Sequence, residues 1–198
     1  SSSGDLMAEV LSAAVVRWGG GRPTLPHNWR SDVGGYEIPA AATAVHGITT
    51  EAARAAGRPA AEVIAEIVGT LRTYVHEGWP LVAMNAQFDF TIQERECERY
   101  GIPSLWSGSV PCVLDPRVLD KQASPYRKGK RTLTALADFW CVRVTGDAHE
   151  AETDARTACA VVHALGRRYR HFARMGLGDL HEYQARWARE QTADIRAY

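Results

Sequence analysis

The pattern of apolar and polar positions divides the first third of the chain into short segments. Residues 9–18, EVLSAAVVRW, are short, apolar and rich in valine, and the glycines that follow form a turn signal. This pattern predicts a strand that enters a hairpin. Residues 36–57 predict loop and short helical turns, with Thr49 or Thr50 as a helix N-cap.

The next segments alternate between helical and strand-like patterns. Residues 59–78 carry apolar side chains at helical spacing, which predicts an amphipathic helix that ends near the glycine at position 78. The run WPLVAMN, residues 79–85, is typical of a strand buried on both faces, and a helix is expected over about 88–100. SVPCVLDP, residues 109–116, predicts a second buried strand with Asp115 at its end.

Helices dominate the last third of the chain. Helical patterns cover 131–140 and 149 to about 170, and a polar segment from about 180 is also expected to be helical. Strands that alternate with helices predict an α/β fold with a mixed central sheet flanked by helices and a helical C-terminal tail. At 198 residues, the chain fits one domain, with a core over about 9–170 and the tail over about 178–198.

Composition narrows the classes of function. The 23 basic and 23 acidic side chains balance, so no overall positive field indicates a nucleic-acid or membrane partner, and a polyanion would have to be held locally. No apolar run reaches the roughly 20 residues of a membrane span, and no signal peptide is recognised. The four cysteines lack zinc-finger spacing and are interpreted as buried, reduced thiols, so a cytoplasmic location is expected.

Two acidic residues, Asp89 and Asp154, are candidates for a functional site because of the segments in which they lie. Asp89 follows a predicted strand end, where side chains of an α/β sheet line the ligand crevice, although a first-turn acid also favours the helix dipole. His149 and Asp154 are five residues apart and would point apart in one continuous helix. They converge only if His149 lies in the loop before the helix and Asp154 lies one turn inside it. Taken alone, this pair also fits two surface side chains.

Several spaced motifs together give a resemblance. NAQFD, ERECERYGIP, VLDP, RTLTALADFW and HEAETDARTA occur in this order, preceded by IPAAATAVHGIT. They resemble the DnaQ-like family of 3′-to-5′ exonucleases, in the DEDDh subgroup whose last motif carries histidine, over residues 9–165. The resemblance implies an RNase H-like core and a metal-dependent exonuclease. Its substrate would be a single-stranded or frayed 3′ end of DNA or RNA, its partner a polymerase or repair complex, and no membrane would be involved.

The resemblance also implies roles for individual residues. Asp89 and Asp154 would be the metal ligands of the second and third motifs, and the cofactor would be two Mg²⁺ or Mn²⁺ ions. Such hard cations favour oxygen ligands and stabilise the attacking and leaving oxygens of a phosphoryl displacement. His149 would be the general base that takes a proton from the attacking water.

Weaker signals surround these residues. His46 is either a substrate contact or a loop histidine, and Asn85 and Phe88 flank the second motif. Phe88 is favoured as a core residue, with a platform for a base as the alternative. The loop YRKGKR, residues 126–131, is either a phosphate grip or a solvated loop, and the basic segment 166–174 is favoured as a solvated helix face. Asp115 is expected to support the end of the sheet or to cap the helix that follows it.

The chain departs from the family in its first motif. That motif is an Asp-x-Glu pair whose carboxylates share one face of the first strand, and no such pair precedes residues 9–18. Asp5 and Glu9 would lie roughly 13 Å apart on an extended strand and cannot replace it. Either the chain has been cut after its first strand, which is favoured, or the ligands have been lost. The 198 residues should therefore show weak activity at most, and an inactive module that binds nucleic acid or protein is the alternative.

Overall fold

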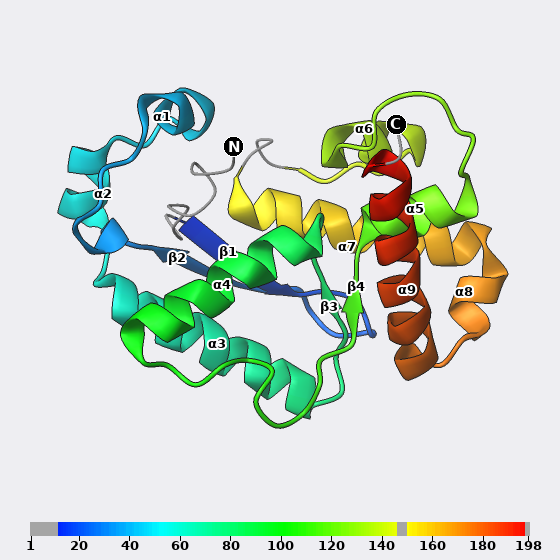
Figure 1. Cartoon of the computed structure of the whole chain (residues 1–198), viewed down its shortest axis with the longest axis horizontal. Helices are drawn as coiled ribbons and strands as arrows, with labels where there is room; N and C mark the ends of the chain where they lie inside the picture. Colours follow the sequence, from blue (N-terminus) through cyan, green and yellow to red (C-terminus); the bar gives the residue numbers. More distant parts are fainter. Residues whose placement is uncertain (1–11, 146–149, 197–198) are drawn as a thin grey trace.

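A strand hairpin opens the fold. The structure, a computed structural model, describes residues 12–145 and 150–196 (Figure 1). Strand β1 (Ser12–Arg17) pairs antiparallel with β2 (Leu25–Arg30), which confirms the predicted hairpin. Gly19, Gly20 and Gly21 in the connection all have positive φ. Glycine adopts this conformation without the steric penalty of a side chain, so the three glycines let the chain reverse.

The helices that follow the hairpin also agree with the sequence pattern. After a single 3₁₀ turn, η2 (Val33–Gly35), come α1 (Ala40–His46), α2 (Thr50–Ala56) and α3 (Ala60–His76). The hydroxyl of Thr49 accepts a hydrogen bond of 3.1 Å from the backbone N–H of Ala52, so Thr49 is the N-cap of α2. The apolar side of α3 packs with Cys97 and with Trp29 of the hairpin.

The two buried strands exist but are shorter than predicted. Strand β3 (Leu81–Val82) pairs in parallel with β4 (Val113–Leu114), and only two residues of each strand form the ladder. Pro80 and Pro111 have no backbone N–H to donate, which limits the ladder at its start. Beyond β3 the chain turns at once into helix, which limits the ladder at its other end.

Helices make up the rest of the described chain: α4 (Ala86–Tyr100), α5 (Pro116–Ala123), α6 (Leu133–Phe139), α7 (Ala151–Arg168), α8 (Arg170–Arg174) and α9 (Leu177–Arg196). The helix expected to run to about residue 170 is interrupted at Tyr169, whose φ and ψ are −112° and 82°. Its hydroxyl lies 2.9 Å from the Ser124 hydroxyl, and its ring packs edge-on against Trp140. Tyr169 is thus held by the core while the helix axis changes.

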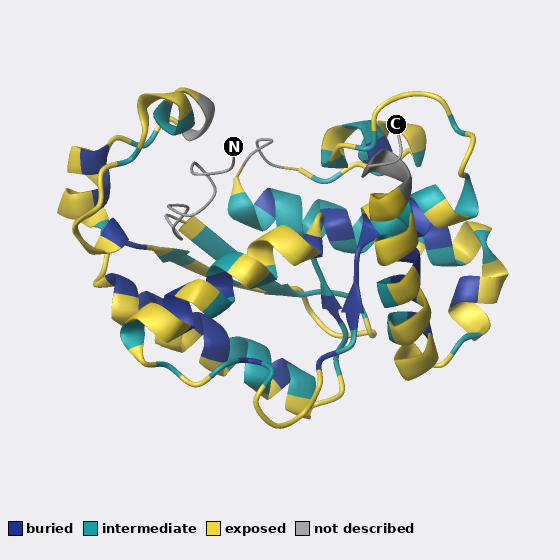
Figure 2. Ribbon diagram, viewed as in Figure 1, coloured by how far each residue is buried: buried dark blue, intermediate teal, exposed yellow. Residues whose placement is uncertain are grey.

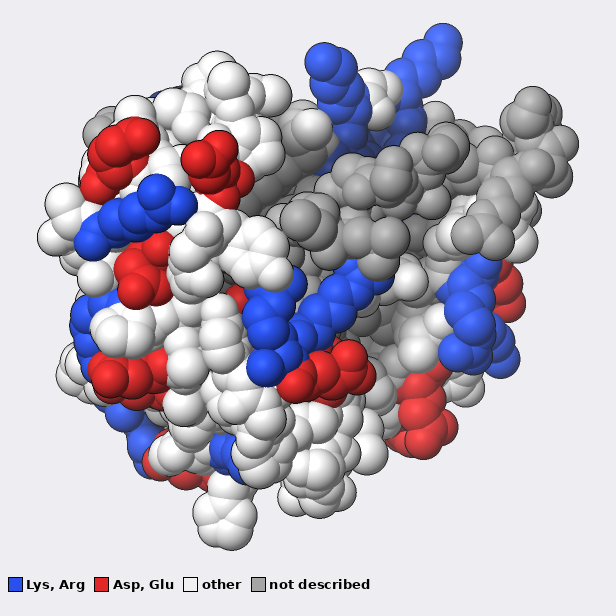
Figure 3. Space-filling view, turned by 60° about the vertical axis from the view of Figure 1, so that its left-hand side comes forward, with Lys and Arg blue, Asp and Glu red and all other residues white. Residues whose placement is uncertain are grey.

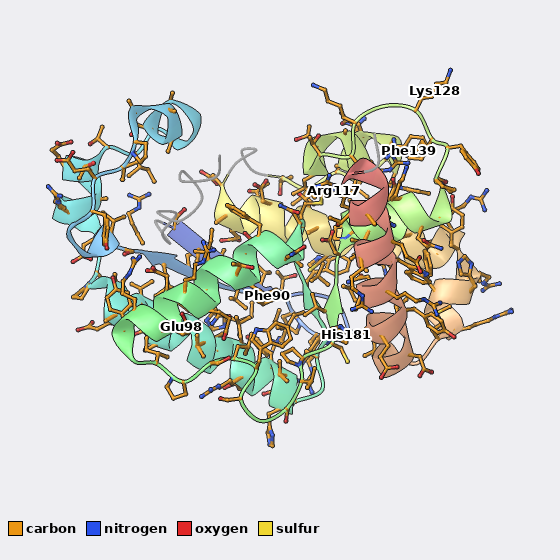
Figure 4. The ribbon with its side chains drawn as sticks, viewed as in Figure 1. Phe90, Glu98, Arg117, Lys128, Phe139 and His181 are labelled. Carbon is orange, nitrogen blue, oxygen red and sulfur yellow. The ribbon has the colours of Figure 1, made fainter. Side chains whose placement is uncertain are left out.

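The helices cover the strands and connect the two pairs. Helix α7 contacts β1, β2 and β3, so it spans both strand pairs. Helix α9 covers β4: the backbone N–H of Val113 donates to Nδ1 of His181 at 3.0 Å, and the side-chain amide of Gln184 donates to the Val113 carbonyl at 3.1 Å (Figure 4). The buried residues lie along β3 and β4 and on the inner sides of the helices, whereas β1 and β2 are intermediate or exposed (Figure 2). This arrangement confirms an α/β fold with parallel and antiparallel pairing. In the described ranges, no helix combines the length and the apolar character that a bilayer crossing requires.

Candidate active site

Asp89 is positioned by a sharp turn between β3 and α4. Asn85 adopts a left-handed conformation, with φ 58° and ψ 44°, and its carbonyl oxygen accepts a hydrogen bond of 2.9 Å from the N–H of Phe88. Helix α4 starts at Ala86, two residues earlier than the sequence pattern predicted, so Asp89 lies in its first turn. The turn brings Asp89 to the carboxyl end of β3, the edge where α/β sheets place ligand-binding side chains.

Asp115 lies at the same edge of the β3–β4 pair, at the end of the neighbouring strand. It is buried at the end of β4 and is the N-cap of α5, because Oδ1 accepts a hydrogen bond of 2.9 Å from the N–H of Arg117. Its Oδ2 accepts a second hydrogen bond of 2.9 Å from the N–H of Ala86. The sequence predicted a supporting or capping role, and the structure confirms both. One carboxylate therefore fixes the starts of α4 and α5 relative to each other.

Asp115 and the surrounding protein atoms change the ionisation of Asp89. The residue Asp89 as a whole is exposed, yet the protein atoms packed around its carboxyl group remove part of the hydration of that group. This desolvation, together with repulsion from Asp115, raises the pKa of Asp89 to about 6. A carboxylate so placed gains more from a nearby cation than an ordinary surface carboxylate does.

Asp154 lies one turn inside α7, as the resemblance required. The helix starts at Ala151, and the N–H of Asp154 donates to the carbonyl of Glu150 at 2.9 Å. Next to it, Glu152 accepts a hydrogen bond of 2.8 Å from the side chain of Asn28, which ties the start of α7 to β2. Helix α7 also packs on β3, the strand that leads to Asp89. His149 lies outside the described residues.

The three residues that are expected to contact the substrate lie in α1, in the turn before α4 and in α4 itself. His46 is the last residue of α1 and precedes Gly47, which ends that helix with φ 72°. Asn85 is exposed at the turn before α4. Phe88 has 49% of its surface exposed, so its interpretation as a core residue is wrong. The turn leaves Phe88 on the outer side of α4, directly before Asp89.

The donor groups fit a hard divalent cation in type. Carboxylate oxygens are the ligands that Mg²⁺ and Mn²⁺ prefer, and the desolvation and the repulsion from Asp115 that raise the pKa of Asp89 are both effects that a bound cation would offset. Asp115, however, already uses both oxygens for backbone hydrogen bonds. Within residues 12–145 and 150–196, no three histidine, cysteine, aspartate or glutamate side chains are grouped closely enough to hold a metal ion. The carboxylate of Asp89 thus fits a hard divalent cation in the chemistry of its oxygens, but the described residues do not gather a full set of ligands around it.

The basic loop at 126–131 is divided: its two arginines turn into the protein, whereas Lys128 and Lys130 are exposed. Arg127 and Arg131 turn inward and donate to Oδ2 of Asp120 at 2.7 and 2.8 Å, and the indole N–H of Trp140 donates to Oδ1 at 3.0 Å. Asp120 is completely buried. Sequence reasoning missed Asp120, because nothing in the largely polar segment 116–123 marks this carboxylate as buried or as the partner of the two arginines. Lys128 remains at the outer tip of the loop (Figure 4).

Comparison with known proteins agrees with this architecture. A family model described as Exonuclease, RNase_T, matches residues 31–162, which include Asp89, Asp115 and Asp154. No curated protein matches the sequence significantly. The family match and the α/β arrangement confirm the RNase H-like fold that the resemblance to DnaQ-like exonucleases implied. Because the match covers well over half of the sequence, the chain belongs to the RNase_T family of exonucleases.

Proposed function

We propose that the protein is a metal-dependent 3′-to-5′ exonuclease that removes nucleotides from a single-stranded or frayed 3′ end of DNA or RNA. The observation that carries this proposal is the position of Asp89. Its carboxylate is accessible to solvent, stands at the carboxyl end of the β3–β4 pair, and is crowded by the buried Asp115. Within an exonuclease family, such a group is best explained as a metal ligand.

Three residues would carry the chemistry. Asp89 and Asp154 would hold two divalent cations, Mg²⁺ or Mn²⁺, which when bound supply positive charge to the oxygens of the scissile phosphate. His149 would accept the proton of the attacking water, since imidazole titrates near neutral pH. His46, Asn85 and Phe88 would contact the substrate near its end. The exposed ring of Phe88 is suited to stack on a base.

The missing first motif limits activity. No Asp-x-Glu pair precedes β1 in the sequence, and in the described ranges β1 pairs only with β2 and β3 only with β4. We propose that, without such a pair, the 198 residues hydrolyse nucleic acid slowly or not at all. Free thiols support the cytoplasm as the compartment, and a polymerase or repair complex is the proposed partner.

A second function is favoured by one observation. The sequence carries no Asp-x-Glu pair before β1, so the alternative is a module that keeps the fold and binds a nucleic-acid end or a partner protein without chemistry. The two functions differ in whether turnover appears once carboxylates of the first motif are supplied.

The test is nucleotide release from 3′-labelled and 5′-labelled single-stranded DNA and RNA with Mn²⁺ or Mg²⁺. The 198-residue chain and a form extended by an Asp-x-Glu strand are compared. Stepwise release from the 3′ end by the extended form supports the exonuclease. Glu98→Gln is the matched control, because Glu98 lies on α4 at the end far from β3 (Figure 4). No release by either form, with strand binding retained, would favour the module.

A further inference from the structure

A basic groove lies outside the candidate active site. It has a volume of about 580 Å³ and is formed by the end of β1, the segment after α6 and the C-terminal half of α7. We call it the arginine groove, and the residues that define it are Trp18, Trp140, Arg143, His163, Arg167 and Arg168. None of the side chains lining it is acidic. On the face of the molecule shown in Figure 3, by contrast, acidic and basic side chains are interspersed.

No acidic side chain in the described part of the chain pairs with the arginines of the groove. Among the described residues, Arg143 and Arg167 have no ion pair or side-chain hydrogen bond, and Arg168 only lies over the ring of Tyr169 at 5.4 Å. Arg167 and Arg168 also favour the negative end of the α7 dipole. That effect explains their place on the helix, but it does not explain why Arg143 approaches from another element. Three arginines that line one groove with no acidic side chain among the lining residues offer donors that suit phosphate groups.

Aromatic rings line the same groove. Trp18 packs edge-on against His163, with ring centroids 5.7 Å apart. Trp140 is held in place because its indole N–H donates to the buried Asp120. Faces of such rings stack on unpaired bases, whereas the bases of a duplex are already stacked on each other. Phosphate-binding arginines beside aromatic rings therefore favour a single strand over a duplex.

The groove is separate from the candidate metal ligands. His163 follows Asp154 by nine residues on α7, which places it about 14 Å further along the axis and half a turn around the helix. Ala160, His163 and Arg167 share the face of α7 that lines the groove. A strand in this groove would be held away from the bond that is cut.

We propose that the arginine groove binds single-stranded nucleic acid at a distance from its 3′ end, through phosphates on the three arginines and a base on Trp18 or His163. This inference rests on the proposed function, since the ligand is the same strand that would be degraded. The groove would keep that strand bound between successive cleavages.

Binding can be tested without hydrolysis. A fluorescent 15-nucleotide single strand is titrated in EDTA, at several salt concentrations, with the wild-type protein and with the Arg143→Ala, Arg167→Ala double variant. For single strands, each lost phosphate contact lowers the salt dependence of log Kd by about 0.7, so the slope should fall by about 1.4. Arg189→Ala, an exposed arginine on α9 outside the groove, is the matched control and should bind like the wild type.

A second pair of variants tests the aromatic contact. Trp18→Ala should weaken binding by about fivefold or more, because a base stacked on an aromatic ring contributes about 1–3 kcal/mol, while Trp18→Phe keeps a ring and should bind nearly as well. Unfolding curves show whether either variant remains folded. Unchanged affinity and salt slope in the arginine variant, equal binding to a duplex, or binding to a mononucleotide as tight as to the strand would each overturn the proposal. Strand binding with no turnover, even by the form that carries an Asp-x-Glu strand, would support the groove and contradict the exonuclease, so the two failures are distinguishable.

Discussion

The backbone N–H of Ala86 donates a hydrogen bond of 2.9 Å to Oδ2 of Asp115, across the carboxyl ends of two parallel strands. This contact joins the first residue of α4 to the N-cap of α5. It determines where α4 begins and therefore where Asp89 stands. The buried carboxylate does not need to touch a substrate in order to position the candidate site.

Replacing Asp115 by alanine should destabilise the fold. The N–H groups of Ala86 and Arg117 would lose their acceptor in a buried environment, and the loss should be about 2–4 kcal/mol of unfolding free energy. Urea denaturation measures it. Asp138→Ala, at an exposed position of α6, should change the unfolding free energy little. Equal stability of the two variants would show that solvent satisfies both N–H groups after the substitution.

The charge of Asp89 should make the metal-free protein sensitive to pH. Its pKa is raised from 3.8 to about 6, so between these values the folded state binds a proton that the unfolded state has released. The contribution of Asp89 therefore lowers the unfolding free energy as the pH rises from 3.8 to 6. The Asp89→Asn variant should lack this component when both proteins are unfolded in EDTA.

Carbon-13 NMR of the Asp89 carboxyl group gives the direct measurement, with a titration midpoint near 6. In Asp115→Asn the midpoint should fall, since one source of the increase is repulsion from Asp115. A midpoint near the ordinary aspartate value in the wild type would contradict the crowding described for this carboxylate.

The ion pairs of Asp120 should be far more important for stability than those on the surface. Asp120→Ala leaves two nearly buried guanidinium groups, those of Arg127 and Arg131, without their acceptor, which should destabilise the protein by about 3–5 kcal/mol. Glu190→Ala removes an exposed pair, with 3.8 Å between Arg186 Nε and Glu190 Oε1, and should change stability by only about 0–1 kcal/mol. The two variants are compared by thermal and urea unfolding.

Limited trypsin digestion gives a second readout of the same variant. The loop around Lys128 should be cut faster in Asp120→Ala, because Arg127 and Arg131 no longer fasten it to the core. If Asp120→Ala loses stability without faster cleavage at this loop, the carboxylate supports the core and not the loop.

The four free thiols should react in a fixed order. Cys141 is exposed, whereas Cys97 is buried, and burial raises the pKa of Cys97 and raises that of Cys159 to about 11. The thiolate is the nucleophile, so Cys141 should react first with a disulfide reagent at pH 8 and Cys159 much later. Cys141→Ser should remove the fast phase. A fast phase that persists in this variant would assign it to Cys112.

The features that the sequence predicted correctly are those that depend on periodicity and on contacts between nearby residues. The glycines after Trp18 imposed the hairpin, and Thr49 caps α2 through a hydroxyl that only needs a neighbouring N–H. Asp115 was expected to support the end of the sheet or to cap the helix after it, and it caps α5, whose first residue is a proline. In each case the interacting atoms are a few residues apart.

The features that the sequence did not predict depend on contacts between distant segments. Phe88 is apolar but exposed, because the left-handed Asn85 sets the rotation of α4. Nothing local shows that two of the basic residues of the loop turn inward, since their acceptor, Asp120, lies on α5. Arg143 and Arg167 are likewise far apart in the sequence and share a groove only through the packing of α6 and α7.

Substitution of the proposed catalytic residues should separate metal binding from proton transfer. In a form that carries an Asp-x-Glu strand, Asp89→Asn and Asp154→Asn should abolish nucleotide release, because each removes a carboxylate ligand. His149→Ala should lower the rate by about 10²–10⁴-fold and leave the metal ligands in place. Calorimetric titration with Mn²⁺ distinguishes the two effects: the aspartate variants should lose metal affinity, and the histidine variant should retain it.

The Glu98→Gln control should match the parent in both assays. Full turnover in any one of the three variants would remove that residue from the mechanism, and loss of metal affinity in His149→Ala would make the histidine a ligand and not the general base.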